Sequence, residues 1–177
     1  MKIITLRKGL VIAFSFGALI LGIAVYAATN ITIADGTYAY FEQFGGPATT
    51  RMRTLTIAPG EVLGWHNHPG VGAYTIVKQG TLTVEDGCGG ETVYTAGQAF
   101  LEPAGRVHRG KNLTAGEVIT AQTFIVPVGT PFTIDTGQVC GRPIRVEECY
   151  HDGWMNFNYP RTFGSQGDCV HFVLNGN

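Results

Sequence analysis

The chain has few charged residues. Only 14% of its 177 residues are Asp, Glu, Lys or Arg, and the formal net charge at pH 7 is -1. Proteins that bind nucleic acid usually present a basic surface to the phosphates, so we expect no nucleic-acid partner. Beyond residue 30 the sequence also lacks a long amphipathic helical pattern and an internal repeat. These absences argue against a helical bundle and against a repeat architecture.

Glycine and short β-forming runs, in contrast, are plentiful. The chain contains 25 glycines, and 45% of its residues are hydrophobic, which is enough for one core. About ten runs of alternating or β-branched residues predict strands, separated by turn-forming steps such as Gln79-Gly80. These runs cover residues 37–44, 51–58, 62–66, 73–78, 81–85, 91–94, 98–102, 107–112, 118–126 and 132–134. The pattern predicts an all-β fold of the jelly-roll barrel type.

Residues 1–27 have the features of a secretory signal peptide. Lys2, Arg7 and Lys8 form a positive head, residues 9–25 are an uncharged apolar run, and small residues precede a cleavage site after Ala27. An uncleaved membrane anchor is the alternative, because the apolar run is at the lower limit of what crosses a bilayer. The absence of a charge after the run favours cleavage. We therefore expect a secreted or periplasmic protein without stable membrane association.

Export changes the interpretation of the four cysteines. In an oxidising compartment an even number of cysteines indicates disulfides. The chain also lacks the Cys-x-x-Cys motif that would indicate redox chemistry. Four cysteines allow three pairings, and their spacing does not choose among them. Their order favours one pairing, since Cys88 lies in a turn of the predicted barrel and Cys140 follows its last strand, while Cys149 and Cys169 bracket the tail. We predict the disulfides Cys88–Cys140 and Cys149–Cys169.

Three histidines stand in a pattern that is typical of a metal site. His66 and His68 are two residues apart, so in an extended strand their imidazoles leave the same face. His108 follows a Pro-Ala-Gly corner that suits a tight change of direction. Three neutral imidazoles favour a divalent transition metal over calcium or magnesium, which prefer oxygen ligands. The alternative for a His-x-His pair is structural, with both side chains solvated or hydrogen-bonded.

Two segments that contain these histidines resemble the signature motifs of the cupin superfamily. The second motif is matched throughout, at Gly97, Pro103, Gly105, His108 and Asn112. The first motif is matched at Gly60, His66, His68 and Gly80. The resemblance covers about residues 31–135 and implies a double-stranded β-helix that holds one metal ion through His66, His68 and His108.

The glutamate ligand of the cupin pattern is missing from the first motif. Ala73 stands in its place, and neither Gly72 nor Tyr74 beside it is a carboxylate. If Glu102 points inward, it replaces this fourth ligand. Glu102, Tyr74 and Arg106 are the polar residues near the motifs, and they are our candidates for an acid, a base or a substrate anchor. Each also has a structural interpretation. Glu102 is then a solvated carboxylate, Tyr74 packs on the outer face of the sheet, and Arg106 is a surface charge.

Residues 136–177 differ in composition from the barrel, and we expect them to form a disulfide-linked C-terminal module. Residues 149–173 resemble a short tail of diverse secreted bacterial proteins, matched at Gly153-Trp154 and at residues 166–170, whereas Ser165 stands where that tail has asparagine. No activity follows from this likeness. His151 and His171 have no spacing that links them to the barrel site, so we expect both to be solvated.

The resemblance implies a mononuclear metal centre, with iron as the expected metal and zinc, manganese or nickel as alternatives. Three protein ligands leave coordination positions open for a substrate. With iron the expected activity is dioxygenation of a small organic molecule, whereas the other metals suit Lewis-acid isomerisation or hydrolysis. The competing hypothesis is a non-catalytic module that binds or senses a small ligand or a metal. Many cupins associate through their sheets, so a homodimer is expected by analogy.

Overall fold

Alternation of buried and exposed side chains builds the barrel. In a computed structural model, which describes residues 28–176, every second residue of β9 (Val118–Pro127) is buried. Strand β4 (Ala73–Gln79) shows the same alternation from Ala73 to Val77. Because side chains alternate between the faces of a strand, each strand gives one face to the interior and one to the outside.

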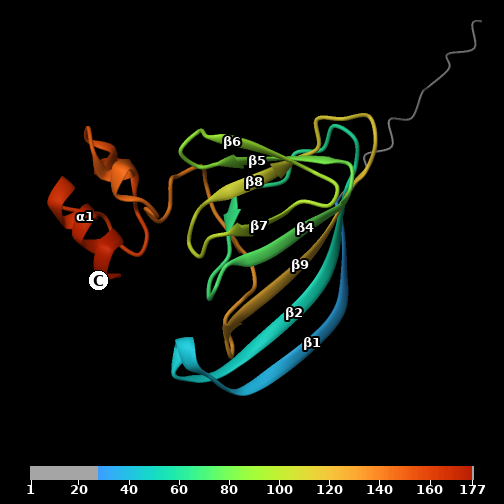
Figure 1. The fold of residues 1–177 in the computed structure, drawn as a ribbon, viewed down its shortest axis with the longest axis horizontal. Coiled ribbons are helices and arrows are strands. Elements are labelled where there is room, and N and C mark those ends of the chain that lie inside the picture. The colour runs from blue at the N-terminus through green and yellow to red at the C-terminus, as the bar shows by residue number, and fades with distance from the viewer. Residues whose placement is uncertain (1–27, 177) are drawn as a thin grey trace, which may run out of the picture.

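The strands form two antiparallel sheets of five strands each, which face one another (Figure 1). The first sheet has the order β1 (Thr29–Phe41), β2 (Gly46–Ile57), β9, β4 and β7 (Ala99–Glu102). The second has the order β10 (Ile134–Asp135), β3 (His66–Asn67), β8 (His108–Lys111), β5 (Thr81–Asp86) and β6 (Glu91–Thr95). The all-β barrel predicted from the sequence is therefore confirmed. A buried apolar cluster closes one part of its interior, with Leu55, Ile57, Val77, Leu82 and Val118.

Two predicted strands differ most from those observed. The first strand begins eight residues earlier than predicted, at Thr29 rather than at residue 37, and a 3-10 turn at Glu42–Phe44 ends the run. The run at residues 62–66 is mostly not strand, because only Val62 makes an isolated bridge, to Lys111, before β3 starts at His66. The extended run thus contributes backbone contacts to β8 without forming a ladder.

A tail with its own small core follows the barrel. It contains the 3-10 helices η2 (Val146–Cys149) and η3 (Gly153–Asn156) and the helix α1 (Gln166–Asn175). The buried residues of this core are Cys140, Cys149, Phe157, Phe163, Cys169 and Phe172. The sequence pattern did not predict α1. Its start is fixed by Ser165, whose Oγ accepts a hydrogen bond from the Asp168 backbone at 3.1 Å.

Both disulfides join the cysteines in the expected pairs. Cys88–Cys140 links the turn between β5 and β6 to the start of the tail, and Cys149–Cys169 links η2 to α1 inside the tail core. Figure 1 shows the tail as a lobe beside the barrel. One disulfide therefore attaches this lobe to the barrel, and the other stabilises the lobe itself.

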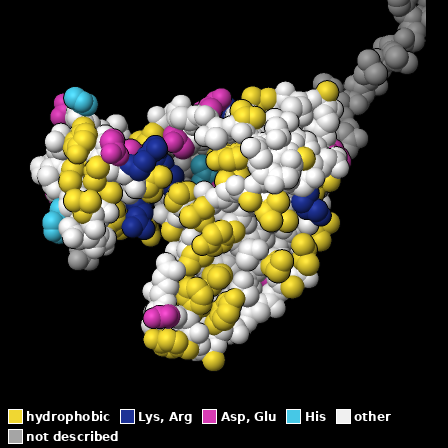
Figure 2. All heavy atoms as spheres, in the orientation of Figure 1, with side chains coloured by type: hydrophobic (Ala, Val, Ile, Leu, Met, Phe, Trp, Pro, Cys, Tyr) yellow, Lys and Arg dark blue, Asp and Glu magenta, His cyan; other side chains and the backbone are white. Residues whose placement is uncertain are grey.

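Charged side chains reinforce the junction between tail and barrel. The buried guanidinium of Arg106 lies 3.0 Å from a carboxylate oxygen of Asp86 in the barrel and 3.1 Å from one of Glu148 in the tail. Figure 2 shows acidic and basic side chains gathered in this region. A buried ion pair that spans two segments is costly to break, because removal of one partner leaves a buried charge.

Residues 1–27, the predicted signal peptide, lie outside the described residues. Within residues 28–176, none of the helices has the length and apolar character needed to cross a bilayer.

We expect the tail to depend on its internal disulfide. The Cys149→Ala/Cys169→Ala double variant removes a link across 20 residues, which should destabilise the tail by roughly 3 kcal/mol. Limited proteolysis should then cut the tail more rapidly than in the wild type, while the far-ultraviolet circular dichroism of the barrel persists. Leu174→Ala, at an exposed position of α1, should leave the digestion rate unchanged. An equally resistant double variant would contradict this role of the disulfide.

Candidate metal centre

Adjacent strands of the second sheet carry the three histidines. His66 starts β3 and pairs directly with His108, the first residue of β8, while His68 follows β3 immediately. The imidazole centroids of His66 and His108 are 4.6 Å apart, and those of His66 and His68 are 4.9 Å apart. Trp65 has the opposite orientation, since its ring lies 4.3 Å from the guanidinium carbon of Arg109. The two-residue spacing thus places both imidazoles of the His-x-His pair on the inner face.

Backbone carbonyls orient all three imidazole rings. Nδ1 of His66 lies 2.8 Å from the Gly64 carbonyl oxygen, and Nδ1 of His68 lies 2.8 Å from that of Phe132. Nδ1 of His108 lies 3.0 Å from the carbonyl oxygen of Arg106. A carbonyl oxygen only accepts, so each Nδ1 must carry the proton. Whenever such a ring is neutral, its lone pair is on Nε2, which is the arrangement that a metal-binding histidine needs.

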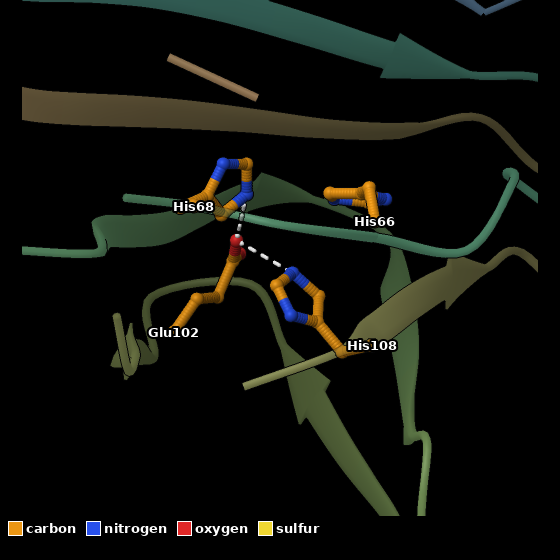
Figure 3. A group of neighbouring side chains, drawn as sticks. All are labelled: His66, His68, Glu102 and His108. Atoms are coloured by element: carbon orange, nitrogen blue, oxygen red, sulfur yellow. Dashed lines mark hydrogen bonds and ion pairs between the residues drawn. The ribbon is translucent and has the colours of Figure 1, made fainter. Parts of the chain in front are cut away.

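Glu102 completes the cluster. One carboxylate oxygen, Oε2, lies 2.8 Å from Nε2 of His68 and 3.0 Å from Nε2 of His108 (Figure 3). The other oxygen, Oε1, accepts hydrogen bonds from Thr75 Oγ1 at 2.8 Å and from Gln122 Nε2 at 3.3 Å. Two donors therefore hold the carboxylate so that its second oxygen points at the histidines.

Strand register explains how Glu102 replaces the missing glutamate. Ala73 of β4 stands directly opposite Glu102 of β7, so both side chains lie on the inner face. Gly72, just before Ala73, has a φ of 87°, and a Cβ there would collide with the carbonyl oxygen of Glu102. Glycine thus allows β4 and β7 to approach closely. The carboxylate comes from the neighbouring strand rather than from the position of the cupin motif.

The ionisable side chains of the cluster shift one another's pKa. Burial would raise the pKa of Glu102, but the hydrogen bond with His108 and the close approach of the His68 ring hold it well below its usual value. Burial would lower the pKa of His108, yet the hydrogen bond to Glu102 and its negative charge raise it. Burial lowers the pKa of His66 to about 4, with the neighbouring imidazoles adding to the effect. Glu102 is therefore an anion at neutral pH, and His66 is a neutral ring that is able to donate a lone pair.

These four residues fit a divalent metal ion. One ligand atom from each of His66, His68, Glu102 and His108 lies within 4.8 Å of all the others. Nε2 of His68 is buried and makes no hydrogen bond within the described chain, although Oε2 of Glu102 is close to it. Buried polar atoms are nearly always satisfied, and a cation among these nitrogens would satisfy this one. Three imidazoles and one carboxylate form a donor set that suits transition metals.

The cluster opens into a cavity of about 270 Å³, which is lined by His66, Glu102 and His108. Apolar side chains form much of the wall, with Leu55, Ile57, Leu63, Leu82 and Val84. The volume suits a small organic molecule placed next to the cluster.

The other sequence candidates lie elsewhere. Tyr74 is 53% exposed on the outer face of β4, between the buried residues Ala73 and Thr75. The side chain of Arg106 binds Asp86 and Glu148 at the junction with the tail. Neither residue lines this cavity of about 270 Å³. Arg106 lines a second cavity together with Glu102 and His108, but its side chain is already paired with Asp86 and Glu148, so the structure favours the structural interpretation of both residues.

Further residues have roles that the sequence-based reasoning missed or left open. Thr75 and Gln122 hold Glu102, and both occupy inward positions of strands where apolar residues are usual. That break in the alternation was the available signal.

Asn112, the last residue of the second motif, is buried and donates from Nδ2 to the carbonyl oxygens of Ile57 and Gly116, which makes it structural. His151 and His171 are exposed in the tail, as expected.

Comparison with known proteins finds one family model that matches part of this chain. The family model of the cupin domain matches residues 53–134, which include all four residues of the cluster. A comparison with curated proteins finds no relative.

The solved structures that match part of this chain include an uncharacterised conserved protein with a double-stranded β-helix domain from Klebsiella pneumoniae. It is 18% identical, with a TM-score of 0.44, over 60% of this chain and 84% of that one. A cupin-like protein from Thermotoga maritima is 22% identical, with a TM-score of 0.42, over 50% and 65% of the two chains. An oxalate oxidase is 26% identical, with a TM-score of 0.39, over 45% of this chain. The match spans less than half of the oxalate oxidase chain, at 46%.

We expect Glu102 to contribute strongly to metal affinity. Glu102→Ala removes the only carboxylate among the four clustered ligand residues, so the affinity for zinc should fall at least about 100-fold in a chelator-competition titration. Glu117→Ala, at an exposed position, should bind zinc as the wild type does. Unchanged affinity in Glu102→Ala would exclude this residue as a ligand.

The strand register provides a rescue experiment for the same residue. Since Ala73 faces Glu102 across β4 and β7, the Ala73→Glu/Glu102→Ala double variant returns a carboxylate to the cluster from the opposite strand. Zinc affinity should recover in part relative to Glu102→Ala, as measured by the same titration. An equally weak double variant that is folded by circular dichroism would show that the two positions are not interchangeable.

Proposed function

Because this chain belongs to the cupin superfamily through residues 53–134 and encloses a cluster of three histidines and one glutamate, we propose that it is an exported, metal-dependent enzyme. Its substrate is a small organic molecule, its metal is iron, and its reaction is an oxygenation. The observation that carries this proposal is the position of the cluster at the wall of a cavity of about 270 Å³. A closed structural metal site would have no such space beside it.

The chain's own residues have separable tasks in this proposal. His66, His68 and His108 would hold the metal through Nε2, because their Nδ1 atoms are bound to backbone carbonyls. Glu102 would be the anionic ligand. Iron bound there would supply the redox chemistry of oxygenation, whereas zinc, manganese or nickel would supply Lewis-acid chemistry.

The remaining residues control the surroundings of the reaction. Thr75 and Gln122 keep Glu102 oriented by hydrogen bonds to Oε1. The aliphatic side chains give part of the cavity an apolar wall, which would strengthen electrostatic interactions with a bound substrate. A small apolar body would pack against this wall while its reacting group lies near the histidines.

Two disulfides indicate an extracellular or otherwise oxidising compartment. The contact of Ala28 is compatible with export through a signal peptide of residues 1–27. Its backbone nitrogen donates to Oε1 of Glu61 at 2.6 Å. Cleavage after Ala27 would turn this nitrogen into an α-ammonium group beside the same carboxylate, and the hydrogen bond would become an ion pair.

We expect metal analysis to reveal iron. The exported wild-type protein should contain about one equivalent of iron, as one mononuclear site requires, and His66→Ala or His108→Ala should contain almost none. Inductively coupled plasma mass spectrometry measures the metal, and an oxygen electrode with a panel of small organic molecules measures the activity. His171→Ala, which changes an exposed tail histidine, should retain full iron.

The outcomes separate the proposal from its competitors. Iron together with substrate-dependent oxygen uptake supports it, and zinc without oxygen uptake would favour Lewis-acid chemistry. A metal-bound protein that binds a small molecule without turnover would support the non-catalytic binding or sensing role instead. A folded wild type without metal after exposure to iron, zinc, manganese and nickel would exclude the proposed enzyme.

We expect the exported protein to begin at Ala28. Its intact mass should lack residues 1–27, because the small residues before Ala28 fit signal peptidase cleavage. Intact-mass spectrometry and N-terminal sequencing check this start. A product that begins at Met1 would contradict cleavage and favour an uncleaved anchor.

A further inference from the structure

Arg53 projects into the same cavity as the metal cluster. It lies on β2 directly opposite Gln122 of β9, and both side chains line the cavity. Nε of Arg53 donates to Oε1 of Gln122 at 2.8 Å, and its guanidinium carbon lies 4.6 Å from the ring centroid of Phe124. These two contacts hold the planar guanidinium in one place.

The terminal nitrogens of this guanidinium lack partners. Within residues 28–176, neither Nη1 nor Nη2 of Arg53 donates a hydrogen bond, and no carboxylate lies within ion-pairing distance of Arg53. Other arginines of the barrel and tail do have carboxylate partners, namely Arg51, Arg106, Arg109, Arg145 and Arg161. Arg142 also has none, but it lies in the tail, over the ring of Phe172.

The lack of a counter-ion is significant because Arg53 is half-buried. An arginine stays protonated in proteins, so its charge must be compensated when water is removed. Glu102 is the carboxylate of the cluster and its charge acts on Arg53, but its two oxygens are already used by Thr75, Gln122 and the histidines. Asp135 also lines the cavity, but it is exposed and does not lie within ion-pairing distance of Arg53.

We infer that Arg53 is the anion-binding subsite of this cavity and that the ligand is a small monocarboxylate with an apolar body. The two free terminal nitrogens can bind both oxygens of one carboxylate side by side. The aliphatic wall of Leu55, Ile57 and Leu82 accommodates the rest of the molecule. One guanidinium compensates one negative charge, which matches a monoanion. The inference rests on the proposed function, since it assumes that the substrate occupies the metal cavity.

Binding of paired probes tests this subsite. Benzoate and hexanoate should bind the exported wild type more tightly than benzyl alcohol and hexan-1-ol, their neutral counterparts, in isothermal titration calorimetry. Arg53→Met keeps much of the side-chain length and removes the charge. It should weaken carboxylate binding at least about tenfold, while the affinity for the alcohols stays the same.

Arg51→Met is the matched control. Arg51 is two residues away on the same strand, but it makes an ion pair with Asp35 and does not line the cavity. Carboxylate affinity should therefore be unchanged in this variant. Each titration is carried out on the protein as purified and again after removal of metal by a chelator, because a carboxylate can also bind a metal directly.

The result separates the subsite from the enzyme hypothesis. A tenfold loss in Arg53→Met in the chelated protein supports the subsite even if no metal or turnover is found. Equal carboxylate affinity in wild type and Arg53→Met would overturn the inference. A wild type that binds neither carboxylate better than its alcohol would overturn it as well, whatever the metal analysis shows.

Discussion

The pairing of Ala73 with Glu102 across β4 and β7 is the constraint on which the candidate site depends. It brings a carboxylate to the inner face at a place where the cupin motif would supply one from the other strand. Without this register, three histidines would face one another without an anion among them. The low pKa of Glu102 and the raised pKa of His108 both follow from this arrangement. The metal centre is thus a product of long-range strand pairing as much as of local sequence.

The sequence was sufficient to predict the barrel and the clustering of the three histidines, because both depend on local patterns. Alternation with a period of two is a local property, so β9 is visible in the run of residues 118–126. The His-x-His spacing is local as well, because two imidazoles on one strand must share a face. The orientation of Glu102 was left open, since it depends on the register between β7 and β4, and no residue near Glu102 specifies that register.

The tail illustrates the opposite case. Helix α1 was not predicted, because ten residues with little periodicity carry a weak signal. Its stability comes from tertiary contacts instead, with Cys169 and Phe172 buried in the tail core. Short helices are marginal in isolation and depend on such packing. The partners of Arg106 were equally invisible, since Asp86 and Glu148 lie 20 and 42 residues away in sequence.

Arg106 has a consequence for how variants of this protein are interpreted. Its backbone carbonyl orients the ring of His108, while its side chain fastens the tail to the barrel. A substitution at this position would loosen the tail and, through the same residue's main chain, the segment that leads into a metal ligand. Loss of activity in such a variant would imitate the loss of a catalytic arginine, although the guanidinium does not line the cavity of about 270 Å³ beside the histidines. Only a structural probe of the tail, recorded together with turnover, would separate damage to the scaffold from damage to the chemistry.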